Sequence, residues 1–548
     1  MGSRSIDYTA EDRFTKITMI ISFLMLPLGG LFGILQLLKR TPGFPDPVSD
    51  STYYTILTGH GVVLAIVFTT FFIMGISAYI VSRELKTNFS RLALNGSLAL
   101  TLLGTVLAAV AILSGRAKVL YTFYPPMSGS PLFYIGAALL VIGTWVFMFD
   151  VFRIIISWKR ANPDYRIPVA TYGILTTWVI WLVATPPVAI EVVLMLIPMS
   201  LFGMSVDVLL ARTLFWWFGH PLVYFWLLPA VSLWYYAIPR VLGVPLFSET
   251  MAKVAYILYM IASTPVGLHH QFVDPGISPI LKLLHTFTTF VVATPSMLTA
   301  FNILATLERA GRARGGKGLV GWIFKLPWGS LAFSGLMLPI ILFANGGITG
   351  IINASFQLNT VVHNTTWIVG HFHLTVGGAT ALTFIAAMLI LAREMVGKEI
   401  VAPWLAVAGF YMWTVGQTIF SIGYYIAGIE GAPRRTSDLS YGGLAPSDWI
   451  PWLQIGAIGG IVFWIGGVVL VGVIAATLLW GKRVTISSDR LLDFEGTQIR
   501  RVENGKYVLE EVRFWIIATI VIAILGYVGP LYEIFSRGLV PVGPVPPG

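Results

Sequence analysis

Long apolar stretches alternate with short polar segments along almost the whole chain. A bilayer core is crossed by about 20 apolar residues in a helix, so each stretch is long enough to span a membrane. The pattern predicts an all-α fold, a polytopic membrane helical bundle of about 13 transmembrane helices. Because the polar segments are short, we expect one integral-membrane domain, 1–548. The predicted spans lie near 16–38, 54–82, 95–113, 131–157, 171–203, 212–238, 254–270, 282–306, 328–353, 365–392, 402–427, 452–480 and 514–536.

The composition agrees with a membrane protein and limits the possible metal chemistry. The chain is 56% hydrophobic and 11% charged, whereas soluble domains carry about 25% charged residues. It contains no cysteine, which excludes disulfides, iron–sulfur clusters and thiolate copper sites within it. Any metal must therefore be bound by histidine, carboxylate or backbone groups.

The basic residues behind the net charge of +10 gather on one side of the predicted membrane. With thirteen spans, the N-terminal segment and the loops after even-numbered spans carry 26 of the 35 Lys and Arg, including loops 309–317 and 482–513. The positive-inside rule places this side in the cytoplasm and the C-terminus outside. We therefore expect a multi-pass membrane protein in contact with lipid, and no nucleic-acid partner. The Pro-rich tail 540–548 is expected to lie against a partner or to stay mobile.

Eight histidines fall at one predicted depth, in or near the outer third of the membrane. A lone histidine in a helix is usually a packed core residue. Eight at one depth indicate function, because ionisable groups are costly inside a bilayer, and imidazole is a common ligand of copper and heme iron. They are His60, His220, His269, His270, His285, His363, His371 and His373.

The spacing of the histidines predicts how they divide among metals. His371 and His373 are two residues apart, so on a helix they point about 200° apart and suit two metals on opposite sides. His269 and His270 are adjacent at a predicted helix end, before an Asp-Pro-Gly breaker. They can converge on one ion if the backbone loosens there.

His220 and Tyr224 are one helical turn apart, on the same face. The sequence around them, and around the other histidines, resembles the signatures of heme-copper oxidase subunit I. The resemblance covers nearly the whole chain, in the same order. It rests on Trp216-Trp217-Phe218-Gly219-His220-Pro221-Leu222-Val223-Tyr224, His269-His270-Gln271-Phe272-Val273-Asp274-Pro275-Gly276, His363-Asn364 with His371-Phe372-His373, Pro433-Arg434-Arg435, and Thr58-Gly59-His60-Gly61.

Within that family the chain looks like the B-type branch, which has archaeal and thermophilic bacterial members. Leu222 stands where the A-type pattern has a glutamate, and the loop 310–318 also looks B-type. The resemblance implies a terminal oxidase of a prokaryotic respiratory chain, in the plasma membrane. Its implied reaction is the four-electron reduction of O2 to water, coupled to electron transport and proton pumping.

The resemblance also implies the cofactors: one low-spin heme, one high-spin heme and one copper ion, CuB. Each ligand is carried over by matching the motif residue by residue. The implied ligands are His220, His269 and His270 for CuB, His60 and His373 for the low-spin heme, and His371 for the high-spin heme.

Five further residues near these ligands are assigned by resemblance. Tyr224 matches the redox-active tyrosine that is linked in the family to the histidine one turn earlier, although a buried tyrosine alone is usually a packing residue. Arg434 and Arg435 are expected to pair with heme propionates, because guanidinium groups suit carboxylates. His363 and Asn364 are expected to line the same region.

Protons must reach a site near the outer face from the cytoplasm. Tyr224 and Tyr235 are eleven residues apart, three turns along one helix face, with Thr289 and Thr299 on the neighbouring span and Ser248 in the loop below. These five resemble the single proton path of B-type members. Each hydroxyl taken alone could instead bond to its own helix backbone.

Four residues remain open. Val231 replaces a tyrosine of the B-type path, where a water could take its place. Asn359 occupies a position at which a carboxylate can stand in a relative. Glu191 is a carboxylate within a span and could relay protons. His285 resembles an outer-surface residue, and no function is assigned to it.

Two other functions are compatible with parts of the sequence. A nitric oxide reductase has a similar scaffold, but Tyr224 and the leucine at position 222 argue against it. A transporter would instead have polar, discontinuous helices at mid-membrane. The electron donor, a cytochrome c-like protein or quinol, is not encoded here. The usual entry copper, CuA, needs cysteines, so a subunit II would carry it if it is present.

Overall fold

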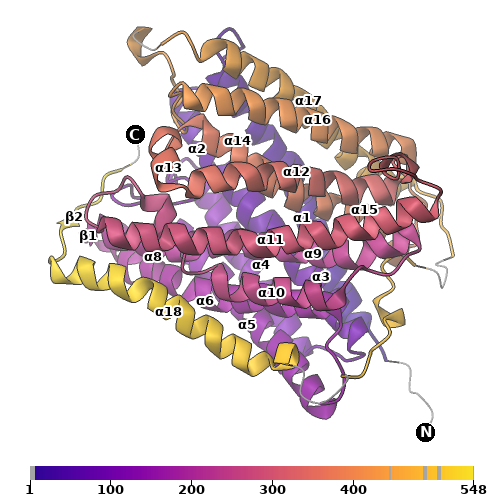
Figure 1. Cartoon of the computed structure of the whole chain (residues 1–548). Helices are drawn as coiled ribbons and strands as arrows, with labels where there is room; N and C mark the ends of the chain where they lie inside the picture. The colour runs from indigo at the N-terminus through magenta and orange to yellow at the C-terminus, as the bar shows by residue number, and fades with distance from the viewer. Residues whose placement is uncertain (1–5, 444–445, 486–489, 503–507, 547–548) are drawn as a thin grey trace.

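The structure, a computed structural model, describes residues 6–443, 446–485, 490–502 and 508–546. Within them, twelve helices are long and apolar enough to cross a membrane. The long helices run side by side in one bundle (Figure 1). A helix satisfies its own backbone hydrogen bonds, which is what a chain in lipid requires. The expected all-α membrane bundle is confirmed.

Several spans consist of two or three helical segments joined end to end. The elements are α1 Thr9–Arg40, α2 Asp50–Gly61, η1 Val62–Phe68, α3 Thr69–Glu84, α4 Arg91–Leu113, α5 Pro131–Ala161, α6 Val169–Ile190, η2 Glu191–Leu196, α7 Ile197–Phe202, β1 Val206–Asp207, α8 Val208–Gly219, α9 Pro221–Leu242, α10 Glu249–Ala262, η3 Gly267–Gln271, α11 Pro279–Ala313, η4 Ile323–Lys325, α12 Leu331–Ala354, α13 Phe356–Val362, α14 Thr366–Phe372, η5 His373–Ala381, α15 Leu382–Val396, α16 Pro403–Ile429, η6 Tyr441–Gly443, α17 Ile450–Trp480, η7 Phe494–Gly496, η8 Val508–Glu510, α18 Val512–Ser536 and β2 Pro541–Val542.

The predicted span 254–270 differs from the other twelve. Its helix, α10, has only 14 residues, and the chain continues through Pro265 and the short 3-10 turn η3. Proline lacks an amide donor and does not extend the helix. Irregular backbone at membrane depth is tolerated where protein buries it, and most of η3 is buried. This crossing is therefore half helix and half irregular.

In the described part of the chain, three segments are π-helical, and each begins at or near a residue with candidate chemistry. η1 follows His60 by two positions, η2 begins at Glu191 and η5 begins at His373. π-Helical turns are rare and occur often at functional sites. The hydrophobic pattern did not predict them, because a one-residue bulge leaves a long apolar stretch unchanged.

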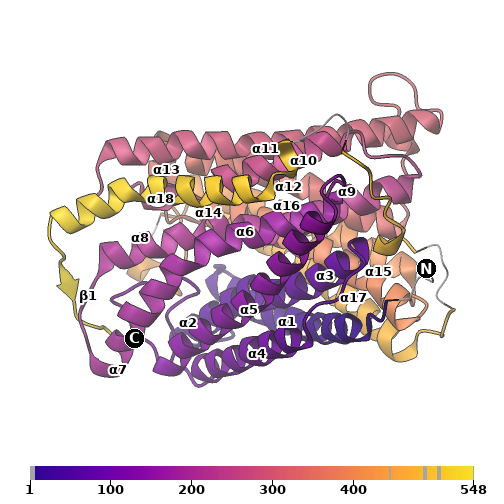
Figure 2. The same ribbon diagram turned by 90° about the horizontal axis from the view of Figure 1, so that it is seen from below.

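The two ends of the bundle differ in composition. We call the end where α3, α5, α9 and α11 finish the basic end, and the opposite end the histidine end. The short sheet of β1 and β2 lies at the histidine end (Figure 2), with Val206 opposite Val542. Val545 bridges to Met127. The described part of the tail is therefore held by its own chain, although β2 stays exposed, and its expected contact with a partner stays a prediction. Residues 486–489 and 503–507 of the predicted basic loop, and 547–548 of the tail, lie outside the described residues.

Candidate functional site

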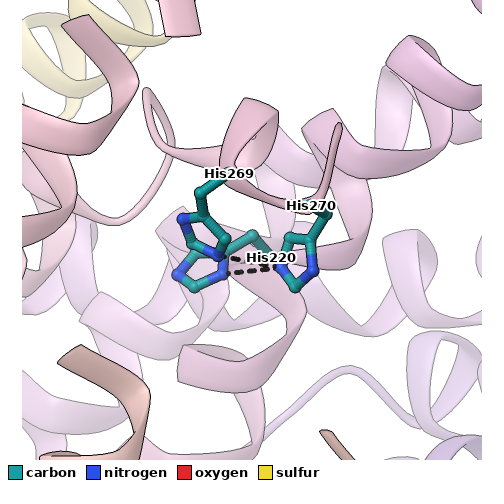
Figure 3. Close-up of side chains that lie close together, drawn as sticks. All are labelled: His220, His269 and His270. Carbon is teal, nitrogen blue, oxygen red and sulfur yellow. Dashed lines mark hydrogen bonds between the residues drawn. The ribbon is translucent and has the colours of Figure 1, made fainter. Parts of the chain in front are cut away.

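Three histidines converge at the histidine end of the bundle. His220 lies at the junction of α8 and α9, and His269 and His270 lie in η3. His220 Nδ1 is 3.1 Å from His270 Nε2, which is 3.0 Å from His269 Nε2. Figure 3 shows the three rings turned toward one another. One ring nitrogen from each lies within 4.8 Å of the others, a geometry that can hold one metal ion.

The outward-facing nitrogens of two of these rings have their own partners. Thr289 donates its hydroxyl to the His285 carbonyl at 2.5 Å, so His269 Nδ1, 3.0 Å away, donates to the Thr289 oxygen. His220 Nε2 lies 3.1 Å from the Tyr224 hydroxyl. Such bonds fix the tautomer and aim a free nitrogen at a metal.

A second group of histidines has the same hydrogen-bonding arrangement. The Nδ1 atoms of His60, His371 and His373 bond to backbone carbonyls at 2.8, 3.0 and 2.8 Å. Each therefore keeps Nε2 available as a ligand. The His60 and His373 rings are 6.2 Å apart and 19° from parallel, which leaves space for one ion between them.

Glycines keep space open beside two of these rings. A Cβ atom at Gly33 would come within 3.1 Å of the His60 ring, and one at Gly350 within 3.0 Å of the His371 ring. Contacts this short are tighter than most real Cβ contacts. The glycines therefore let a backbone approach rings that a larger residue would displace.

A cationic cluster lies in loops at the histidine end. Asn364, in a left-handed conformation, accepts from the Arg434 side chain at 3.0 Å and from its backbone amide at 2.9 Å. Burial and the adjacent Arg435 lower the pKa of Arg434 to about 9, so it is still a cation at neutral pH. The Arg435 Nη2 atom is buried without a partner among the described residues. This unpaired donor fits an anionic ligand.

His363 lies beside this cluster. Its Nδ1 atom is 3.1 Å from the Asn359 side-chain oxygen. Burial, followed by the charge of Arg434, lowers the pKa of His363 to about 4. The imidazole is therefore neutral at physiological pH, and the amide of Asn359 holds it without adding charge.

The expectation for His285 is wrong. The residue is fully buried, and its Nε2 atom bonds to the Gly526 carbonyl at 2.9 Å. Its Nδ1 atom accepts from the Leu268 amide at 3.3 Å. The side chain therefore joins α11, η3 and α18, and it supports the turn that carries two of the converging histidines. The position of His285 along its helix predicted its depth in the membrane, but it did not predict that the side chain faces the interior of the bundle.

The five hydroxyl residues of the predicted proton path, which we call the hydroxyl line, are connected by hydrogen bonds only in part. Tyr235 donates to Thr299 at 2.9 Å. The Ser248 side chain caps α10 by accepting from the Met251 amide at 3.1 Å. Asn302, which the sequence reasoning missed, bonds to both backbone groups of Ser248 at 3.0 and 2.8 Å. Its three-residue spacing from Thr299 was the available signal. Thr289, in contrast, is bonded to His269 rather than to a tyrosine.

The two remaining open positions are fully buried. Both carboxylate oxygens of Glu191 lack a hydrogen-bond partner within the described part of the chain. Val231 packs in the apolar core and offers no hydrogen-bonding side chain.

Comparison with known proteins defines the class. The family described as cytochrome c and quinol oxidase polypeptide I matches residues 13–462. Cytochrome c oxidase subunit 1 of Thermus thermophilus is 38% identical over 99% of this chain and 98% of its own. Ubiquinol oxidase subunit 1 of Acetobacter aceti is 24% identical over 84% of this chain and 69% of its own. The solved structure of a heme-copper terminal oxidase dimer matches with a TM-score of 0.91 and 37% sequence identity. The match covers 98% of this chain and 95% of the chain in that structure.

The chain therefore belongs to the cytochrome c and quinol oxidase polypeptide I family. It is the catalytic subunit of a heme-copper terminal oxidase, an oxygen reductase that works with other subunits. The family implies hemes and copper, and the residues fit them. Imidazole nitrogens converge or remain free where metals would bind, and the buried Arg435 donor suits a propionate.

Proposed function

We propose that this chain reduces O2 to water at a site formed by the three converging histidines and His371. In this proposal His220, His269 and His270 hold CuB, His371 holds a high-spin heme, and His60 with His373 hold a low-spin heme. The observation that supports it most strongly is the convergence of three ring nitrogens, with Tyr224 bonded to one of the rings.

The surrounding residues each have a defined task in the proposal. Bound hemes and copper would supply electrons and a position for O2. Thr289 holds His269 in the tautomer that leaves Nε2 free. Tyr224, 3.1 Å from His220 Nε2, can donate its proton at the reacting centre. Arg434 and Arg435 bind the heme propionates, Asn364 holds Arg434 in place, and His363 lines the same region.

Four electrons and four protons are needed for each O2 that becomes two waters. We propose that the protons enter from the cytoplasm at the basic end and pass Ser248, Tyr235 and Thr299 to Tyr224. Leu222, which is buried, offers no carboxylate for a second route, in keeping with a B-type oxidase. Pumped protons then share this path. Thr289 lies at its far end, on the metal ligand.

The proposal extends to location and partners. The N-terminal segment and basic end face the cytoplasm of a prokaryote, because 26 of 35 Lys and Arg lie on that side. Electrons come from a cytochrome c-like donor or from quinol. Because this chain has no cysteine, any CuA belongs to a subunit II.

The absorption spectra of two variants test the heme ligands. His371→Ala should lose the high-spin heme and O2 reduction while retaining the low-spin spectrum. His60→Ala should lose the low-spin signal instead. The matched control is His285→Gln, which changes a buried histidine that bonds to backbone. It should retain both signals if it folds.

If either ligand variant keeps both heme signals, the axial assignments are wrong. If the purified wild-type protein holds no heme, the whole proposal is wrong. A spectrum with two hemes and metal analysis with one copper per chain would support it.

A further inference from the structure

The predicted hydroxyl line has a gap at its centre. Tyr224 and Tyr235 are separated by eleven residues of α9, a rise of about 16 Å. Position 231 lies between them on the same helix face, seven residues after the first and four before the second. That position is Val231, which is fully buried and has no hydroxyl. A proton therefore needs another carrier at this depth.

A tyrosine on a different helix occupies that depth. Tyr259 of α10 is fully buried, and its hydroxyl lies 2.8 Å from the Ser296 hydroxyl of α11. It also interacts with Thr299, which accepts from Tyr235. On the other side, its ring centroid is 5.6 Å from that of Tyr224. Tyr259 thus contacts both halves of the interrupted line.

We propose that Tyr259, with Ser296, carries protons across this gap, in place of a residue at position 231. The proposal rests on the proposed function of the chain as an oxygen reductase. In it, the line runs Tyr235, Thr299, Ser296 and Tyr259 to Tyr224. Three helices supply these hydroxyls: α9, α10 and α11.

The transfer leaves Tyr259 unchanged. A proton arriving from the Ser296 or Thr299 side binds a lone pair of the phenol oxygen. The original hydroxyl proton leaves toward Tyr224, and one O–H bond has formed while another has broken. Rotation of the new O–H bond restores the starting arrangement. No electron moves, so no oxidant or reductant is needed.

Tyr259→Phe tests the proposal, because it removes the hydroxyl and keeps the ring. O2 consumption should fall at least fivefold, with heme and copper contents unchanged. The rate of proton uptake on anaerobic chemical reduction, followed with a pH-indicator dye, should fall by a similar factor. Ser296→Ala should slow both rates less, because Thr299 remains as a neighbour of Tyr259.

Tyr256→Phe is the matched control. This tyrosine is also fully buried on α10, but its hydroxyl bonds to Ser232, at 3.1 Å. It should leave both rates at the wild-type value. Adding Val231→Tyr to Tyr259→Phe places a hydroxyl back in the gap and should recover part of the lost rate, which a purely structural role of Tyr259 would not predict.

The outcomes separate this inference from the function it rests on. If Tyr259→Phe and Ser296→Ala both work at wild-type speed while Tyr235→Phe is slow, Tyr259 is not in the path, and the proposed function is unaffected. If Tyr256→Phe is as slow as Tyr259→Phe, the effect is general to α10 and the inference is wrong. A wild-type protein without heme or O2 consumption would instead overturn the proposed function.

Discussion

At the scale of single residues, the site depends on which nitrogen of each ring carries the proton. In His60, His371 and His373, a backbone carbonyl accepts a hydrogen bond from Nδ1–H and leaves Nε2 free. His269 achieves the same result through a side chain, Thr289. A carbonyl cannot be removed by substitution, whereas a threonine can. Thr289 is therefore a position where ligand orientation can be tested directly.

Thr289→Val should weaken the retention of copper, because valine has the shape of threonine but cannot accept the hydrogen bond from His269 Nδ1–H. Loss of such a supporting hydrogen bond typically lowers metal affinity or activity about 10–100-fold. The copper-to-heme ratio after dialysis against a chelator measures the effect.

Thr289→Ser is the control for this change and should keep its copper, since it retains the hydroxyl. If the valine variant keeps all its copper but takes up protons slowly, Thr289 belongs to the proton path as the sequence resemblance implied.

At this scale the sequence was informative for residue types, such as histidine, whose chemistry alone suggests a role in a membrane helix. Spacing indicated that His269 and His270, adjacent at a breaker, could converge on one ion, whereas His220 was added to this set by the family resemblance. Tyr259 could not, because a tyrosine in an apolar stretch is ordinary and its contact with Ser296 depends on how α10 packs against α11. The bond from His269 to Thr289 could not be predicted for the same reason, and the place of Thr289 in the proton path stays a prediction.

At the scale of elements, the short helix α10 is positioned by contacts at its basic end. Lys253 forms an ion pair with Glu510 of η8, and the two side chains are only 3% and 4% exposed. The other oxygen of Glu510 accepts from the Ile167 amide at 2.9 Å, just before α6. This buried pair therefore ties three elements together beneath α10.

Lys253→Met should lower the free energy of unfolding by about 3–5 kcal/mol, because it leaves a buried carboxylate without its partner. A thermal melt in detergent, followed by loss of native absorbance, would show the lower Tm. The double variant Lys253→Met with Glu510→Gln should recover part of it, since no buried charge remains.

Arg312→Met provides the comparison, because Arg312 pairs with Glu308 on the exposed surface of α11. Its effect should stay below about 1 kcal/mol. Equal losses in the buried and exposed variants would show that the buried pair has no special part in holding α10.

Apolar length predicted most helices to within a few residues, because each span has to match the bilayer. It did not predict that α10 would end at Ala262, because apolar length alone takes no account of the helix breaker Pro265 three residues later. The π-helical segments were missed for a related reason. They lie at or next to His60, Glu191 and His373, and a one-residue bulge does not change the hydropathy of the stretch.

At the scale of the whole molecule, the two ends of the bundle are chemically different. The converging histidines and the arginine pair lie at one end, and most Lys and Arg lie at the other. A cavity of about 470 Å³ at the basic end is lined by Tyr235 together with Glu84, Arg240 and Lys253. The start of the proposed proton line is thus close to solvent on the basic side. That the whole chain is one domain stays a prediction.

A topology experiment tests this arrangement. A protease site in the loop 309–325 should be cut only from the cytoplasmic side, because the loop is rich in Lys and Arg. A tag after β2 should be accessible only from outside. The two sites act as controls for each other. The reverse pattern would put every histidine near the cytoplasmic face and remove the need for a long proton path.

The two-residue step from His371 to His373 has one more consequence. Both side chains leave the same short stretch of backbone, at the change from α14 to η5. In the proposed assignment, one ligand of each heme would come from this stretch, so the separation of these two ligands is set by the local backbone and not by the fit between separate helices. Electron tunnelling falls steeply with distance. Thermal fluctuations that change the distances between helices would leave the separation of these two ligands nearly constant. Electron transfer between the two hemes should therefore be insensitive to temperature-driven loosening of the protein.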